Sequence, residues 1–134
     1  MICKWWKNRK AQREIADQKA IFEWQEKYFK DIKFPILILD TNDYIAVSDL
    51  EEYYFDVDIN TYAVNQNCEL IDTKGRIYNF KKINKQQWAP DGLIGTSEFQ
   101  KLKEKVTPLL YMKNHKAEIS TVENIEALIE LLLT

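Results

Sequence analysis

Hydrophobic and polar residues follow one another in two different periods, and the change of period separates helical from extended stretches. From residue 8 to residue 31, Ile15, Phe22 and Phe29 recur every seven positions with charged residues between them. This spacing predicts an amphipathic helix with one apolar face. We expect the helix to end before Pro35, because the residue before a proline avoids the helical conformation.

The next part of the chain has the pattern of short strands joined by turns. Residues 35–39 form a continuous apolar run, and residues 44–47 follow it after a turn-forming stretch. Both are predicted to be strands. Residues 68–71 and 76–80 flank a turn in which Gly75 can adopt a positive φ, so they are predicted to form a hairpin.

Between these strand pairs the pattern supports two elements in succession. Ser48 and Glu51 have the spacing of a capping box, which predicts a short turn of helix. Residues 53–59 then alternate between apolar and polar side chains. That period of two predicts a further strand.

The last third of the chain is predicted to hold two helices after an irregular connection. Residues 84–95 are polar and contain a proline and two glycines, which favours a loop. Thr96 or Ser97 is expected to cap a helix that reaches Met112, and Pro108 should end or kink it.

Ser120 and Glu123 form a second capping-box pattern, which predicts a final helix. The predicted order is therefore one helix, about five strands and two helices. Short turns between consecutive strands favour antiparallel pairing. We predict an α+β fold in which the two C-terminal helices pack on one face of a mostly antiparallel sheet. We expect one domain, residues 1–134, in which residues 1–7 can fray.

The composition is that of a globular chain with its own core. Of the 134 residues, 46% are hydrophobic and 13% aromatic, which is enough to fold without a disulfide or metal. Cys3 and Cys68 are far apart and are expected to be free thiols in a reducing compartment. No apolar run is long enough to span a membrane, and the basic N-terminus has no signal-peptide pattern. We therefore expect a cytoplasmic protein.

Candidate catalytic groups are few. The single histidine, His115, lies between polar and basic neighbours that are unlike those of a general base. Residues 56–60 imitate the start of a calcium loop, but Thr61 and Asn67 stand where that loop needs glycine and glutamate. Zinc spacings and phosphate-binding glycine loops are missing from the sequence. We expect neither a cofactor nor a metal, and no enzymatic activity.

Charge is strongly segregated along the chain, although the net charge is only −2. Residues 1–39 carry nine basic and five acidic side chains, and residues 73–105 carry eight basic and three acidic ones. Residues 40–72 carry nine acidic side chains and no basic one. This middle segment is also rich in tyrosine. Carboxylates steer association with a basic partner while aromatic rings supply contact area.

The candidate partner-binding residues all lie in this middle segment. They are Asp49, Glu51, Glu52, Tyr53, Tyr54, Asp56, Asp58 and Tyr62. A second interpretation stays open, in which the acidic side chains are neutralised internally by cations of the following hairpin. Those cations are Lys74, Arg76, Lys81, Lys82 and Lys85.

The N-terminus carries a second, smaller cluster. Trp5 and Trp6 lie among lysines and arginines, and no acidic residue precedes Glu14. Such a cluster suits weak contact with an anionic lipid surface, or it is a helix start whose tryptophans pack on the domain.

Three functions compete. The first is a protein-binding inhibitor of the immunity type, which a bacterium makes against a basic toxin such as a nuclease; no motif ties the chain to a named family. The second is a nucleic-acid-binding module that uses the basic N-terminal helix with Lys81, Lys82 and Lys85, although the acidic pI of about 5.5 opposes it. The third is a ligand-binding or enzymatic domain with a pocket at Trp88, Tyr44 and residues 53–55.

Overall fold

The computed structural model describes residues 2–113 and 119–133, with side chains described from Ile15 onward. The contacts divide the chain into two compact units, Met1–Lys30 and Asp31–Thr134.

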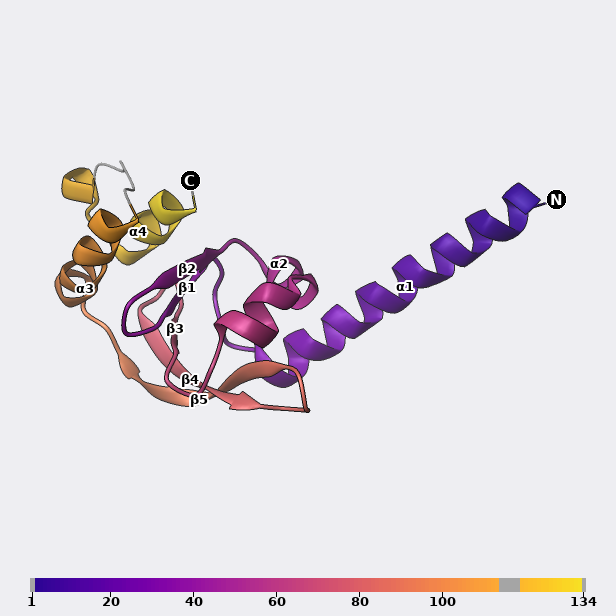
Figure 1. The fold of residues 1–134 in the computed structure, drawn as a ribbon, viewed down its shortest axis with the longest axis horizontal. Helices are drawn as coiled ribbons and strands as arrows, with labels where there is room; N and C mark the ends of the chain where they lie inside the picture. The colour runs from indigo at the N-terminus through magenta and orange to yellow at the C-terminus, as the bar shows by residue number, and fades with distance from the viewer. Residues whose placement is uncertain (1, 114–118, 134) are drawn as a thin grey trace. The chain divides into compact units, whose positions relative to one another are not determined.

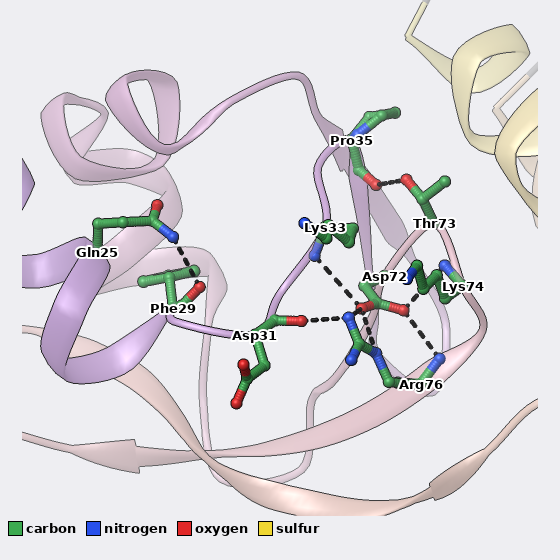
Figure 2. A network of polar contacts seen from close by, with 9 residues as sticks. All are labelled: Gln25, Phe29, Asp31, Lys33, Pro35, Asp72, Thr73, Lys74 and Arg76. Atoms are coloured by element: carbon green, nitrogen blue, oxygen red, sulfur yellow. Dashed lines mark hydrogen bonds and ion pairs between the residues drawn. The ribbon is translucent and has the colours of Figure 1, made fainter.

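The first unit is one long helix, α1, which spans Ile2–Tyr28. It begins earlier than the sequence pattern predicted and ends close to the expected position. Two residues of the predicted apolar face are largely exposed, with 66% of Ile15 and 65% of Phe22 accessible, whereas Phe29 is buried. At the C-terminal end, the side-chain amide of Gln25 donates to the Phe29 carbonyl at 2.9 Å (Figure 2).

The second unit is built on a five-stranded sheet (Figure 1). The strands are β1 (Ile36–Leu39), β2 (Tyr44–Val47), β3 (Glu69–Ile71), β4 (Arg76–Lys82) and β5 (Trp88–Thr96). Their order in the sheet is β2-β1-β3-β4-β5, and every neighbouring pair is antiparallel. The predicted α+β class with an antiparallel sheet is confirmed.

One face of the sheet is covered by helices α3 (Phe99–Met112) and α4 (Ile125–Leu132), as predicted (Figure 1). Leu37 pairs with Ile71 across β1 and β3, and both side chains belong to the core that these helices complete. Apolar residues at helical spacing supply the other half of that core. They are Leu102, Val106, Leu109, Leu110, Leu128, Ile129 and Leu132.

The opposite face of the sheet carries the alternate residues of the same strands, because neighbouring side chains in a strand point to opposite sides. Ile36 and Ile38 of β1 and Leu70 of β3 are buried there. Helix α2 (Leu50–Phe55) and the π-helical segment η1 (Asp58–Ala63) follow β2 in the chain and lie on this side (Figure 1).

The predicted strand at residues 53–59 is wrong, because this segment is helical in α2 and η1. The period-two alternation does not match burial: Tyr53 and Ile59 are buried, but Phe55 and Val57 are 51% and 57% exposed. Leu50 and Tyr53 are buried together at the i, i+3 spacing of one helix face. Tertiary packing therefore outweighs the β propensity of the aromatic and β-branched residues.

The fifth strand lies where a loop was predicted, at residues 88–96. Proline and glycine are tolerated because β5 is an edge strand whose register with β4 shifts twice. Gly75 has the predicted positive φ, 79°, in the turn between β3 and β4. Pro108 does not end α3, which continues to Met112.

The predicted helix caps are displaced by one or more residues. Asp49 rather than Ser48 caps α2, and Asn124 rather than Ser120 caps α4, each side chain accepting a hydrogen bond from the backbone three residues later. The N-cap of α3 is Glu98, whose side chain makes no capping hydrogen bond.

Candidate functional site

The nine carboxylates of residues 40–72 do not form one uniform surface. Two of them form ion pairs with cations outside the segment, Asp72 with Arg76 at 2.8 Å and Asp43 with Lys113 at 2.6 Å. Internal neutralisation by the following hairpin is thus found at Asp72. The five carboxylates between residues 49 and 58 form no ion pair within the part of the chain that the structure describes.

Asp72 is a fully buried structural residue (Figure 2). Its carboxylate accepts hydrogen bonds from the backbone amides of Lys33, Lys74 and Arg76 at 3.3, 3.0 and 2.9 Å. The Arg76 guanidinium donates through Nε at 2.8 Å, and it also bonds the carbonyl of Asp31. The hydrogen bond to Asp72 raises the pKa of Arg76. Asp72 therefore fastens residues 31–33 to the β3–β4 turn.

Asp43 joins the β1–β2 turn to the end of α3. Its carboxylate accepts from Lys113 Nζ and, at 2.8 Å, from the backbone amide of Tyr44. The Lys113 ammonium also donates to the Tyr44 carbonyl at 2.7 Å and lies 4.1 Å from the Tyr44 ring centroid. Burial raises the pKa of Asp43, but the hydrogen bonds and charge of its partners outweigh it and the net shift is downward.

Three acidic side chains shape α2 and η1 themselves. Asp49 accepts from the Glu52 amide at 2.8 Å, and Glu52 accepts from the Ser48 amide and hydroxyl at 2.9 and 2.5 Å. Asp56 accepts from the amides of Asp58 and Ile59 at 3.0 and 3.4 Å. These hydrogen bonds fix the local backbone and leave the carboxylates exposed and negatively charged.

Glu51 and Asp58 are the remaining two of the five carboxylates between residues 49 and 58. Both are exposed, and within the described residues neither carboxylate has a hydrogen-bonding or ion-pairing partner. We call the exposed surface of α2 and η1 the α2–η1 face. It comprises Asp49, Glu51, Glu52, Phe55, Asp56, Val57, Asp58 and Tyr62. A shallow depression in it is lined by Glu52, Phe55, Asp56, Val57 and Asp58.

The three tyrosines predicted to bind a partner lie in different environments. Tyr53 is fully buried, and its hydroxyl donates to the Trp88 carbonyl at 2.6 Å, so its ring belongs to the core. Tyr54 is half-buried and stacks edge-on against Phe55, with ring centroids 5.1 Å apart. Tyr62 is 76% exposed.

Phe55 and Val57 are exposed residues within the segment that was predicted to be a strand, and neither was among the predicted partner-binding residues. The 3.6-residue period of a helix would have predicted their exposure. In α2, Tyr53 is turned to the core, and Phe55, two residues further on, is turned away from it. The backbone of η1 is held by Asn60, a buried side chain that donates to the carbonyls of Tyr53 and Tyr54 at 2.9 and 3.0 Å. Residues 56–60 thus form the end of α2 and the start of η1, and not part of the strand that was predicted for residues 53–59.

The residues of the competing hypotheses are only in part described. Lys81 pairs with Asp91 at 3.5 Å, and Lys82 lies 6.0 Å from the Trp88 ring centroid. His115 and the side chains of Cys3, Trp5 and Trp6 lie outside the described residues. Cys68 is a buried free thiol.

Over residues 2–113 and 119–133, no group of three or more His, Cys, Asp and Glu side chains is placed to hold a metal ion. None of the helices in the described chain has the length and apolarity needed to cross a membrane.

Comparison with known proteins does not assign the chain to a family. Neither a protein-family model nor a curated protein nor a solved structure matches the chain.

Proposed function

We propose that this chain is a non-catalytic protein-binding domain whose α2–η1 face docks on a basic protein surface. The observation that carries the proposal is that five exposed carboxylates follow one another between residues 49 and 58 without a described cation beside them. Like charges held this close repel one another, and an approaching cationic surface relieves the repulsion.

The apolar residues among these carboxylates support an interface over a merely solvated face. Phe55, Val57 and Tyr62 are more than half exposed on the same short stretch of α2 and η1. Aromatic side chains surrounded by polar groups are typical anchors of protein interfaces. The charges would accelerate encounter and select a basic partner, and the rings would supply the buried contact area.

The specific form that we propose is an immunity-type inhibitor of a bacterial toxin with a basic substrate groove, such as a nuclease domain. A groove that binds nucleic acid is positive because it must hold phosphates. The exposed carboxylates of the α2–η1 face can occupy such a groove in place of the phosphates. An inhibitor of this kind acts in the cytoplasm, where a free thiol such as that of Cys68 remains reduced.

The test uses the two carboxylates that do not support the backbone. The double variant Glu51→Gln/Asp58→Asn removes two negative charges from the face and no described hydrogen bond. Asp91→Asn/Glu98→Gln removes the same charge from exposed positions elsewhere. The partners to assay are toxin domains encoded by genes adjacent to that of this chain, with affinity measured by calorimetry at low and high salt and with protection of cells from the toxin.

We expect the face variant to weaken binding at least about tenfold and to reduce the salt dependence, with the control variant close to wild type. A toxin that binds both variants with wild-type affinity would refute the assignment of this face. A chain that neither binds the adjacent toxin nor protects cells is not an inhibitor of it.

A further inference from the structure

A cavity of about 270 Å³ opens between the β1–β2 turn and the segment that joins η1 to β3. Its lining includes the apolar residues Ile38, Ile45 and Cys68, the carboxylates of Asp40 and Asp43, and the ring of Tyr62. No lysine or arginine is part of the lining. Tyr62 also belongs to the α2–η1 face, so the cavity borders the proposed interface.

The cavity is small. Pockets that enclose whole drug-sized ligands measure about 300–1,000 Å³. A half-open cavity just below that range suits a single long side chain or a ligand of similar size. Ile38 and Cys68 are each only 2% exposed, so the half-buried Ile45 is the main apolar side chain that a ligand could contact. Such a mixed lining suits a lysine or arginine, which buries its methylene stem along apolar surface while the charged end stays in polar surroundings.

The charge in this cavity comes from Asp40. Its Oδ1 accepts from the Thr41 amide at 2.6 Å, and its other oxygen has no hydrogen-bond donor among the described residues. Asp43 is already paired with Lys113. Asp40 also borders a neighbouring cavity that Lys105 lines, but no ion pair joins these two residues.

The Tyr62 ring also favours a cation over a neutral ligand. Tyr62 offers an exposed ring at the rim, where a cation would lie against its face. The Cys68 thiol donates to the Ala63 carbonyl at 3.7 Å. Burial, and to a smaller extent the charge of Asp40, raises the pKa of this thiol, which therefore stays neutral. Because Lys113 neutralises Asp43, Asp40 is the one lining carboxylate without an ion-pairing partner among the described residues.

From this geometry we infer that the cavity receives the ammonium or guanidinium end of a lysine or arginine side chain of the bound protein. The inference rests on the proposed function and adds the anchor point of the partner. Asp40 is the ion-pairing residue, Ile45 contacts the stem, and Tyr62 lies at the rim.

Small cations test the cavity without the partner. The probes are butylguanidinium, butylammonium, the tripeptide amide acetyl-Gly-Arg-Gly-NH2, putrescine and, as the neutral control, butanol. Binding to the full chain is followed by amide chemical shifts in NMR. We expect saturable shifts at Ile45, Ala63 and Cys68 with the guanidinium, ammonium and tripeptide probes and none with butanol.

Asp40→Asn keeps the acceptor for Thr41 and removes the charge, so it should weaken the cation probes about tenfold. Asp58→Asn is the matched control, because it removes one acidic charge outside the cavity and should leave the probes within about twofold of wild type. Thermal unfolding of both variants checks that the fold is retained.

Three results would overturn the inference: no shifts at these amides, equal shifts with butanol, or unchanged binding to Asp40→Asn. Putrescine that binds at least tenfold more tightly than the tripeptide would assign the cavity to a free diamine and overturn the side-chain assignment. None of these results touches the proposed function, which depends on Glu51 and Asp58 and is tested with the toxin itself.

Discussion

Replacing Asp72 with alanine tests whether this carboxylate fastens the start of the second unit to the sheet. The substitution removes the acceptor for three backbone amides, those of Lys33, Lys74 and Arg76, and the anion that faces the Arg76 guanidinium. The Asp72 side chain is completely buried, so water cannot replace it without opening the structure.

The expected cost follows from this burial. Removing one partner of a buried ion pair destabilises a protein by about 3–5 kcal/mol. The lower end applies, because the Arg76 side chain is 25% exposed and can be partly rehydrated. We therefore expect a loss of about 3 kcal/mol in the free energy of unfolding. With a urea m-value of about 2 kcal/mol/M, the unfolding midpoint falls by about 1.5 M.

Urea titration followed by tryptophan fluorescence and by circular dichroism measures the change. Asp91→Ala is the matched control, because it breaks the ion pair between Asp91 and Lys81, in which each side chain is 48% exposed. Exposed pairs contribute about 0–1 kcal/mol. If Asp72→Ala is no less stable than Asp91→Ala, the Asp72 carboxylate does not hold these segments together and the reasoning fails.

Two further predictions concern other contacts of the second unit. Gly75→Ala should lower the free energy of unfolding by about 2 kcal/mol, because φ is +79° and the added Cβ would lie 2.8 Å from Ile125 Cδ1 and 2.9 Å from the Ser97 carbonyl oxygen. Thermal unfolding measures this loss, and a variant with the wild-type unfolding midpoint would contradict it. Lys113→Met should raise the pKa of Asp43, measured by NMR titration of its carboxyl group, since Lys113 supplies the hydrogen bond and charge that lower it. Because the folded-state pKa of Asp43 is lowered, its contribution to stability is present above the ordinary carboxyl pKa and is lost as the pH falls through the folded value. The contribution is less than about 1 kcal/mol, because both side chains of the Asp43–Lys113 pair are partly exposed. An unchanged Asp43 pKa in the variant would refute the coupling.

The sequence predicted those elements whose signals are local. Gly75 marks the β3–β4 turn, because few other residues tolerate its positive φ. The apolar runs of β1 and β2 were long enough to identify strands, and the order of elements implied the antiparallel sheet.

Two elements escaped prediction because packing decides them. Residues 53–59 alternate like a strand, yet Tyr53 is held by a hydrogen bond to Trp88, thirty-five positions away, which no local pattern contains. Strand β5 includes Pro90 and Gly92, which argue for a loop until an edge position and two register shifts accommodate them.

The acidic segment was identified from composition, but the separate roles of its carboxylates were not. Charge counting cannot separate Asp72, buried against Arg76, from Glu51, which is exposed. The distinction depends on the three-dimensional neighbours of each oxygen.

The sheet order has a consequence for how the α2–η1 face comes into being. Neighbours in the sheet are also neighbours in the chain except where β1 meets β3, and α2 and η1 lie in the connection between β2 and β3. Forming that one distant pair closes a long loop and carries the largest entropic cost of assembling the sheet. A partner that binds α2 and η1 in their helical form would therefore favour chains in which the β1–β2 hairpin has already paired with the β3–β4–β5 meander, and its binding would stabilise these chains against unfolding.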